Sequence, residues 1–463
     1  MIPLEKYSDK GVAILGLGKT GRAAVNAFDQ AGANPLLAWD DNPTQMMDLP
    51  PHIRTYSYDQ IEWEKYDLLL SSPGIPRCHP MTQAAEAAGC IIKSDIEILW
   101  ESIPHAKYVG ITGTNGKSTT TELISHILSL SNFEFAAGGN LGQPALSLPN
   151  LNANATYLLE VSSYQLALTQ DLTFDIAVLL NISEDHLEMH GSFQSYIKLK
   201  KKIFNQGRLA TAIICTDDEN SKSIYEEICG YENINCVEVT TSKIVNDGIS
   251  IIDGLLHENG KAVFDLTKVT RLKGAHNWQN AGASWAVARN MKVPIEKIYR
   301  AFSSFPGLAH RMEFVATIDG ISFINDSKAT NFAATARALS SFENIFWVAG
   351  GRSKLGSSDI IHDHLNNIKA AFIYGECADK ICNDINKKVK VTKFSTLKEA
   401  VSAAMDCAKN ETIEDKVVLF SPACSSFDQF VNFEARGDEF KKLVNFLDHQ
   451  YTKSARRGKF EQL

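Results

Sequence analysis

The sequence has no long apolar run, no cysteine framework and no excess of positive charge. None of its segments reaches eighteen consecutive apolar residues, and its first residues, MIPLEKYSDKG, lack the apolar core of a secretion signal. Its nine cysteines include no C-x-x-C pair, which argues against a small disulfide-bonded domain or a cysteine-based metal site. We therefore expect a soluble, cytoplasmic protein with reduced, mostly buried thiols and no stable membrane insertion.

The charge balance limits the partners. With 46 basic and 54 acidic residues the net charge is −8 and the pI is near 5.9, which argues against binding to nucleic acid or to an anionic membrane surface. The one basic cluster, at 453–459, is interpreted as a solvated chain end. The length of 463 residues allows two to four domains. We expect a monomer.

The strongest local signal lies at residues 107–121, KYVGITGTNGKSTTT. A short apolar run, a glycine-rich turn and a helical pattern follow one another there. Such a turn directs backbone N–H groups at one point, where the helix dipole favours an anion and a lysine reaches terminal phosphates. The generic Walker pattern requires glycine where this chain has Ile111, so only its Gly116-Lys117-Ser118 half matches. The segment predicts a nucleoside triphosphate site.

A second glycine-rich turn occupies residues 16–21, between a strand at 11–15 and a helix that ends near residue 30. With Asp40 about twenty positions on, it matches the dinucleotide fingerprint. Taken alone, it predicts a phosphate-bearing ligand without identifying it, and an NAD-dependent oxidoreductase is one alternative.

Two acidic or histidine-containing segments follow strands of the central region. Glu160 ends a strand near 156–160, and His186 follows a strand near 175–181, where ligands of open α/β sheets bind. His186 and His190 also suggest zinc, but Leu187 stands where the zincin motif has Glu. A cluster of lysines, Lys198, Lys200, Lys201 and Lys202, lies on a probable helix, and its spacing alone favours a solvated face.

Apolar runs alternate with helical patterns along the whole chain, which predicts an α/β protein of three domains. We expect a Rossmann-like domain at 1–94, a central P-loop ATPase-like sheet with helices on both faces at 95–305, and a second Rossmann-like domain at 306–463. Glycine- or serine-rich loops at 350–354 and 421–426 follow strands of the third domain and suit an anionic small molecule.

Seven motifs occur together and in this order: GTNGKS, EVSSYQL, SEDHL, GAHNWQN, LAHRME, NDSKATN and SPACSSFDQF. They resemble the Mur ligase family, the ATP-dependent amide-forming ligases of bacterial peptidoglycan synthesis. NDSKATN and SPACSSFDQFVNFEARGDEF are most similar to the members that add D-glutamate to UDP-N-acetylmuramoyl-L-alanine. The resemblance also accounts for the incomplete Walker pattern, because GTNGKS is a form that this family uses.

The resemblance implies an ATP site, two Mg2+ ions and a lysine carbamate formed with CO2. The implied ATP-binding residues are Gly113, Thr114, Asn115, Gly116, Lys117, Ser118, Thr119, Asn277, Arg311 and Asp326. The implied metal ligands are Ser118, Glu160, His186 and Lys200, the last as the carbamate, which offers a hard cation anionic oxygen. The implied catalytic residues are Lys117, His186, Lys200 and Lys328. Lys198, Lys201 and Lys202 stay open as alternatives to Lys200, and His186 is a candidate base only if it is not fully committed to metal.

The resemblance also assigns the two substrates. The implied UDP-substrate contacts are Lys19, Thr20, Asp40, Gly74 and Asn140. The implied D-glutamate contacts are Thr330, Lys354, Ser426 and Phe433. Arg352 stands where some members have Asp, which predicts a different hydrogen-bond network beside Lys354. A sister ligase or a folylpolyglutamate-synthase-like ligase that uses another amino acid is the alternative function.

Overall fold

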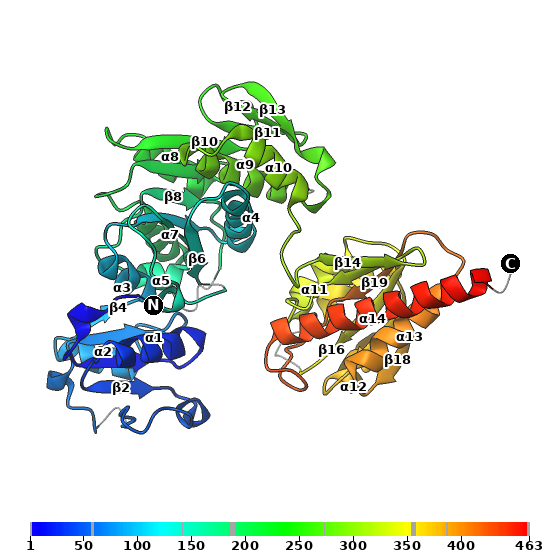
Figure 1. The fold of residues 1–463 in the computed structure, drawn as a ribbon, viewed down its shortest axis with the longest axis horizontal. Coiled ribbons are helices and arrows are strands. Elements are labelled where there is room, and N and C mark those ends of the chain that lie inside the picture. The colour runs from blue at the N-terminus through cyan, green and yellow to red at the C-terminus, as the bar shows by residue number, and fades with distance from the viewer. Residues whose placement is uncertain are drawn as a thin grey trace. The chain divides into compact units, whose positions relative to one another are not determined.

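The structure is a computed structural model that describes residues 2–56, 60–140, 142–185, 190–272, 274–352, 358–385 and 388–460. These residues form two compact units, Met1–Phe305 and Pro306–Leu463, with two sheets in the first unit and one in the second (Figure 1). The prediction of a mixed α/β protein is confirmed. Among the described residues no helix combines the length and the apolar character needed to cross a bilayer.

The first sheet has the order β2-β1-β3-β4, and all its neighbouring strands are parallel. Its strands are β1 (Val12–Leu15), β2 (Leu36–Trp39), β3 (Leu68–Ser71) and β4 (Ile91–Lys93). The helices of this region are α1 (Lys19–Gln30), α2 (Pro80–Ala87) and α3 (Asp95–Ser102). β1 and β3 are wholly buried, as continuous apolar strands of a parallel sheet require.

The second sheet has the order β13-β12-β11-β10-β9-β8-β5-β7-β6. Its parallel strands are β5 (Lys107–Thr112), β6 (Phe135–Gly139), β7 (Thr156–Glu160), β8 (Ile176–Leu179), β9 (Thr211–Cys215), β10 (Asn235–Thr240) and β11 (Ile249–Ile252). The antiparallel strands β12 (Leu255–Glu258) and β13 (Lys261–Asp265) extend it. The helices are α4 (Lys117–Leu130), α5 (Ser163–Ala167), α7 (Phe193–Lys201), α8 (Glu219–Ile228), α9 (Ala275–Asn290) and α10 (Ile295–Ser304).

Alternate residues of the second sheet enter two separate cores. Val109 and Val178 pack with Leu123, Trp285 and Phe302, so α4, α9 and α10 cover one face. The other core joins Tyr108 and Leu179 to residues of α3, α7 and α8, and it continues into the first sheet. The first and second sheets therefore share apolar packing within one compact unit.

The sheet of the second unit has the order β14-β15-β19-β16-β17-β18, with β14 antiparallel and the other strands parallel. Its strands are β14 (Glu313–Ile318), β15 (Ile321–Asn325), β16 (Ile345–Gly350), β17 (Ile368–Tyr374), β18 (Lys390–Phe394) and β19 (Lys416–Phe420). Its helices are α11 (Phe332–Leu339), α12 (Ala378–Ile385), α13 (Leu397–Lys409) and α14 (Phe433–Phe460). α11 and α12 pack on one face, and α13 and α14 on the other.

Candidate active site

The loop between β5 and α4 is held in shape by the segment that follows β8. The Thr114 N–H donates to the Asn181 carbonyl at 2.9 Å, and the Asn115 N–H donates to Asn181 Oδ1 at 2.8 Å. Gly116 ends the loop with a φ of 87°, which glycine adopts readily. A Cβ at this position would lie 2.3 Å from Asn280 Oδ1, so α9 packs directly on the loop. The first N–H groups of α4 have no acceptor within the helix and form the donor set of an anion site.

Two lysines converge on one carbonyl of this loop. Lys117 Nζ donates to the carbonyl oxygens of Gly113 at 2.8 Å and Thr114 at 2.9 Å. Lys200 Nζ, carried by α7, donates to the same Gly113 oxygen at 2.9 Å. Lys200 is 1% exposed, and its ammonium lies 4.8 Å from the centre of the Tyr196 ring. Burial first, and then the charge of Lys117, lowers the pKa of Lys200 to about 7.

The three alternative lysines have other surroundings. Lys198 is exposed, and Lys201 pairs with Glu227 on α8. Lys202 Nζ donates to the Leu166 carbonyl at 2.9 Å, at the end of α5. The structure therefore brings Lys200 to the phosphate loop and turns Lys201 and Lys202 elsewhere.

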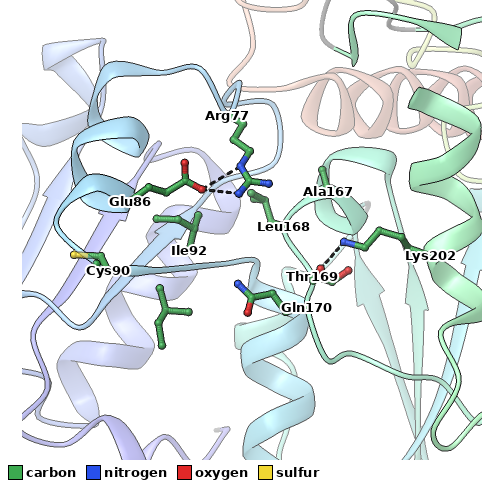
Figure 2. Close-up of a pocket in the computed structure, with 11 residues that line it drawn as sticks. Arg77, Glu86, Cys90, Ile92, Ala167, Leu168, Thr169, Gln170 and Lys202 are labelled. Carbon is green, nitrogen blue, oxygen red and sulfur yellow. Dashed lines mark hydrogen bonds and ion pairs between the residues drawn. The ribbon is translucent and has the colours of Figure 1, made fainter. Parts of the chain in front are cut away.

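A cavity of about 570 Å³ lies between the α2–β4 connection and the end of α5 (Figure 2). It is lined by Arg77, Glu86, Gly89, Cys90, Ile91, Ile92, Ala167, Leu168, Thr169, Gln170 and Lys202. Arg77 and Glu86 form an ion pair at this cavity, with Nη2 and Oε1 2.6 Å apart. The described lining includes none of residues 113–118, so this cavity is separate from the phosphate loop. Lys202 is the one candidate lysine in that lining.

Oxygen donors lie beside the phosphate loop at the same sheet edge. Glu160 ends β7, is 3% exposed and pairs in register with Ile111 of β5. Its Oε1 accepts a hydrogen bond from Asn140 Nδ2 at 3.2 Å. Ser118 is buried in the first turn of α4. Hydroxyl and carboxylate oxygens suit Mg2+. The described residues contain no cluster of three His, Cys, Asp or Glu able to hold a metal, and His186 lies outside them.

α9 begins beside the phosphate loop. Asn277 lies in its first turn, and Asn280 Nδ2 donates to Asn277 Oδ1 at 3.5 Å. Because Asn280 also contacts the position of Gly116, the structure brings Asn277 close to the loop. Thr119 lies in the first turn of α4, half-buried.

Four of the five predicted UDP-substrate residues gather at the carboxyl edge of the first sheet, whereas Asn140 follows β6 of the second sheet and donates to Glu160. Lys19 and Thr20 start α1 after β1, Asp40 follows β2, and Gly74 follows β3 with a φ of 97°. Asp40 Oδ2 accepts from the Leu17 N–H at 2.6 Å, which fixes the glycine turn. These residues meet because β2, β1 and β3 are neighbours.

The second unit places Asp326, Lys328 and Arg311 on adjoining turns. Asp326 follows β15 and accepts from Ser421 Oγ at 2.8 Å and from the Met312 N–H at 3.2 Å. Burial raises the pKa of Asp326 to about 6. The Lys328 N–H donates to the His310 carbonyl at 2.9 Å, beside Arg311.

The predicted amino-acid residues are only partly described. Thr330 precedes α11, Ser426 is buried in the loop after β19, and Phe433 begins α14. Ser327 Oγ donates to the Phe433 carbonyl at 2.8 Å, which joins two of these segments. Lys354 lies outside the described residues.

Arg352, the departure noted in the sequence, forms a two-pronged ion pair with Glu376. Its Nε lies 2.9 Å from Oε2 and its Nη2 3.0 Å from Oε1. Both side chains are about half-exposed, so we assign the pair little stability.

Sequence reasoning missed Arg436, a fully buried arginine of α14. Its Nη2 donates to the Ser327 carbonyl at 2.8 Å, and its Nη1 to the Cys424 carbonyl at 3.0 Å. It therefore connects the loops that carry Asp326 and Ser426. The only signal was its place in the quoted motif NFEARGDEF, because an arginine in a polar helix pattern is typical of a solvated face.

Three family models match the chain. The Mur ligase MurD-like N-terminal domain matches residues 10–94, the Mur ligase middle domain residues 111–288, and the Mur ligase glutamate ligase domain residues 310–424. A UDP-N-acetylmuramoylalanine--D-glutamate ligase of Rhodospirillum rubrum is 41% identical over 97% of both chains. The corresponding ligase of Paramagnetospirillum magneticum is 40% identical over 97% of this chain and 99% of its own.

Solved structures support the fold. A UDP-N-acetylmuramate-alanine ligase from Thermotoga maritima covers 94% of this chain and 99% of its own with a TM-score of 0.58 at 15% identity. A MurF ligase from Thermotoga maritima in complex with ADP covers 98% of both chains with a TM-score of 0.51 at 16% identity. The motifs, the three family models and the full-length relatives agree. The chain belongs to the Mur ligase family.

Proposed function

We propose that this chain is an ATP-dependent ligase of peptidoglycan synthesis that joins D-glutamate to UDP-N-acetylmuramoyl-L-alanine and releases ADP and phosphate. The substrates rest on the names of relatives that are 36–41% identical over nearly the whole chain. One observation supports ATP-dependent ligation most directly: Lys117 and Lys200 both donate to the Gly113 carbonyl, in the loop between β5 and α4. The Lys117 ammonium and the N–H groups that begin α4 suit a triphosphate, and Lys200 lies at the same point, where its carbamate would supply oxygen ligands for magnesium.

We assign residues 1–94 to the UDP-linked substrate, 95–305 to ATP and 306–463 to the amino acid. In this assignment Lys19, Thr20, Asp40 and Gly74 bind the UDP part and Asn140 the sugar end. Thr330, Lys354, Ser426 and Phe433 bind D-glutamate. Asn277, Arg311 and Asp326 contact the nucleotide, and Lys328 its phosphates. The protein acts as a monomer, in the cytoplasm.

Ser118, Glu160, His186 and a carbamylated Lys200 would hold two Mg2+ ions. Magnesium, when bound, would neutralise the phosphate oxygens and polarise the γ-phosphate. The donor set fits, because Ser118 and the buried Glu160 present oxygens at one sheet edge and a carbamate adds two more.

The surroundings of Lys200 support carbamylation by CO2. An amine must be uncharged to attack CO2, and burial together with the charge of Lys117 lowers the pKa of Lys200 to about 7. The amine nitrogen bonds to the carbon of CO2 and loses a proton, which leaves an anionic carbamate. The change from cation to anion removes the repulsion between the two lysine side chains and gives Lys117 a counter-charge.

The reaction needs two steps because a carboxylate is a poor acylating agent. The substrate carboxylate attacks the γ-phosphorus of ATP, ADP leaves, and an acyl phosphate forms. Lys117 stabilises the charge on the transferred group, which is positional and electrostatic catalysis. The D-glutamate amine then attacks the acyl carbon, phosphate leaves, and the amine proton passes to a base, a role that His186 can fill only while its imidazole is not bound to magnesium.

An omission assay with the purified chain tests the proposal. We expect phosphate release only when ATP, UDP-N-acetylmuramoyl-L-alanine and D-glutamate are all present. Replacing D-glutamate by L-glutamate, L-alanine or a diaminopimelate in parallel reactions separates this ligase from its sister enzymes. Incorporation of one of these amino acids in place of D-glutamate would refute the substrate assignment.

A further inference from the structure

Two buried cysteines of the second unit have their sulfur atoms in contact. Cys377 precedes α12 in the loop after β17, and Cys424 lies in the loop after β19. Their Sγ atoms are 2.8 Å apart, and the residues are 4% and 1% exposed. Both are free thiols. A disulfide would require the two sulfur atoms to approach to about 2.05 Å, a shift of less than one ångström.

The two cysteines are attached to the loops that the proposed amino-acid site uses. The Cys377 N–H donates to the Gly351 carbonyl at 2.9 Å. The Cys424 carbonyl accepts from Arg436 at 3.0 Å. Next to Cys424, Ser425 and Arg352 exchange two backbone hydrogen bonds, of 2.9 and 3.0 Å. A bond between the sulfur atoms would therefore tie the loop that carries Ser426 to the loop at 350–352 and to the start of α12.

The surroundings favour Cys424 as the sulfur that reacts first. The hydrogen bond from the Cys377 thiol and the nearby Arg436 charge lower the pKa of Cys424, against the effect of burial. The thiolate is the nucleophile in such chemistry, and Cys377 lies at contact distance to resolve the first product.

We infer that Cys377 and Cys424 are an oxidative modification site, at which a peroxide converts the two thiols into a reversible disulfide. This disulfide lowers kcat/KM for the amino-acid substrate. The Cys424 thiolate attacks one peroxide oxygen, the O–O bond breaks, and the first water leaves once the released hydroxide is protonated. Cys377 then attacks the sulfenic sulfur, a second water leaves, and the S–S bond forms. Two thiols lose two electrons and two protons, and the peroxide gains them. A thiol reductant reverses the change.

Disulfide formation and its effect on the reaction have separate readouts. Formation of the disulfide does not depend on the proposed function. The lower kcat/KM for the amino acid rests on the proposed function. A bond between residues 47 positions apart should raise the melting temperature of the second unit by about 10 °C. Moving a positioning loop by most of an ångström should lower kcat/KM for the amino acid at least threefold, with KM for ATP little changed.

Peptide mapping of the full-length chain tests the site. Protein treated with dilute hydrogen peroxide is alkylated, digested and analysed by mass spectrometry, and a Cys377–Cys424 linked peptide that disappears with dithiothreitol is expected. The Cys377→Ala variant should keep its activity before treatment and form no linked peptide with peroxide, while the matched Cys229→Ser variant should still form the Cys377–Cys424 peptide. Protein that keeps both thiols, or over-oxidises them without a linked peptide, would overturn the site.

The kinetic measurement tests the regulatory part on the same oxidised sample. A lower kcat/KM for the amino acid that dithiothreitol restores supports it, and an unchanged value would overturn it. If the reduced protein shows no ligase activity, the proposed function fails, and peptide mapping still decides whether the disulfide forms.

Discussion

Burial distinguishes Lys200 from its neighbours on α7. Tyr196 and Lys200 are four positions apart, so they share one face of the helix, and that face packs on the phosphate loop. Lys198 is exposed and Lys201 pairs with Glu227. A run of lysines gives no sign of which one is buried, because the chemical type is the same at each position. The sequence resemblance pointed to Lys200, and the packing supplies a physical reason for it.

Replacing Lys200 tests the carbamate. Lys200→Ala should lower kcat at least about 100-fold, because it removes an oxygen ligand and a group that orients Lys117. Short carboxylic acids such as acetate or propionate should restore part of the activity by supplying the missing oxygens. The matched Lys201→Ala variant, altered on the helix surface, should keep full activity. A fully active Lys200→Ala enzyme would remove the carbamate from the proposal.

Asp326 gives the second unit a pH-dependent stability. Burial raises its pKa from 3.8 to about 6, so the folded state binds its proton more tightly than the unfolded state does. The stability that this group contributes is therefore fully present below about pH 4, and it is lost as the pH rises through 6. The shift corresponds to about 2–3 kcal/mol.

The Asp326→Asn variant isolates this effect, because an amide does not titrate. Its oxygen can still accept from the Met312 N–H, and its NH2 group can donate to Ser421 Oγ, which reverses that hydrogen bond. Between pH 4 and pH 7 the free energy of unfolding of the wild type should fall by about 2–3 kcal/mol relative to the variant. Urea titrations of both proteins at several pH values give this difference. A difference that does not change with pH would contradict a raised pKa.

At the scale of elements, close backbone packing explains the glycine that ends the phosphate loop. Gly116 has a left-handed φ of 87°, and a Cβ added to it would lie 2.3 Å from the Asn280 side chain. Gly116→Ala should therefore distort the start of α4 and weaken ATP binding at least tenfold by calorimetry. Gly320→Ala, with a φ of 73° and open space, is the control for backbone strain alone and should leave ATP affinity unchanged. Equal affinities of both variants would contradict the packing argument.

Arg436 connects three elements of the second unit, since it lies on α14 and donates to the loops after β15 and β19. Arg436→Met should lower the free energy of unfolding by about 3 kcal/mol, because two buried carbonyls lose their donors. Arg337→Met, on the exposed side of α11, should change it by less than about 0.5 kcal/mol. Thermal unfolding of the two variants measures the difference, and equal stabilities would show that the buried contacts contribute nothing.

The elements differ in how well the sequence predicted them. Buried strands such as β5 and β19 are continuous apolar runs, so their positions and the parallel sheets follow directly from the sequence. β14 was not predicted, because it is an edge strand in which only Ile318 is fully buried, so its three consecutive apolar residues do not stand out as a core strand. Strand order and the partner of each loop depend on contacts distant in sequence. Arg436 and the Cys377–Cys424 contact were missed for this reason.

At the scale of the whole molecule, the described residues form three sheets, and three family models match the chain. These sheets are nevertheless divided between only two compact units. The first two sheets share a core that includes Val25 of α1, Ile96 of α3 and Leu146. Apolar patterning shows that each of these residues is buried, but it cannot show that different sheets bury them together. The division of the chain at residues 94 and 305 therefore stays a prediction, as do the residue roles assigned from the motifs.

The most direct test of the account follows the oxygen of the substrate carboxylate. UDP-N-acetylmuramoyl-L-alanine labelled with 18O in that carboxylate is incubated with the purified chain, ATP, magnesium and D-glutamate. The masses of the product and of the released phosphate are then measured by mass spectrometry. An acyl-phosphate pathway predicts a product that is heavier by one glutamyl unit. It also predicts one 18O atom in each phosphate released, because the acyl phosphate transfers that oxygen. Unlabelled phosphate, or no glutamyl product, would contradict it.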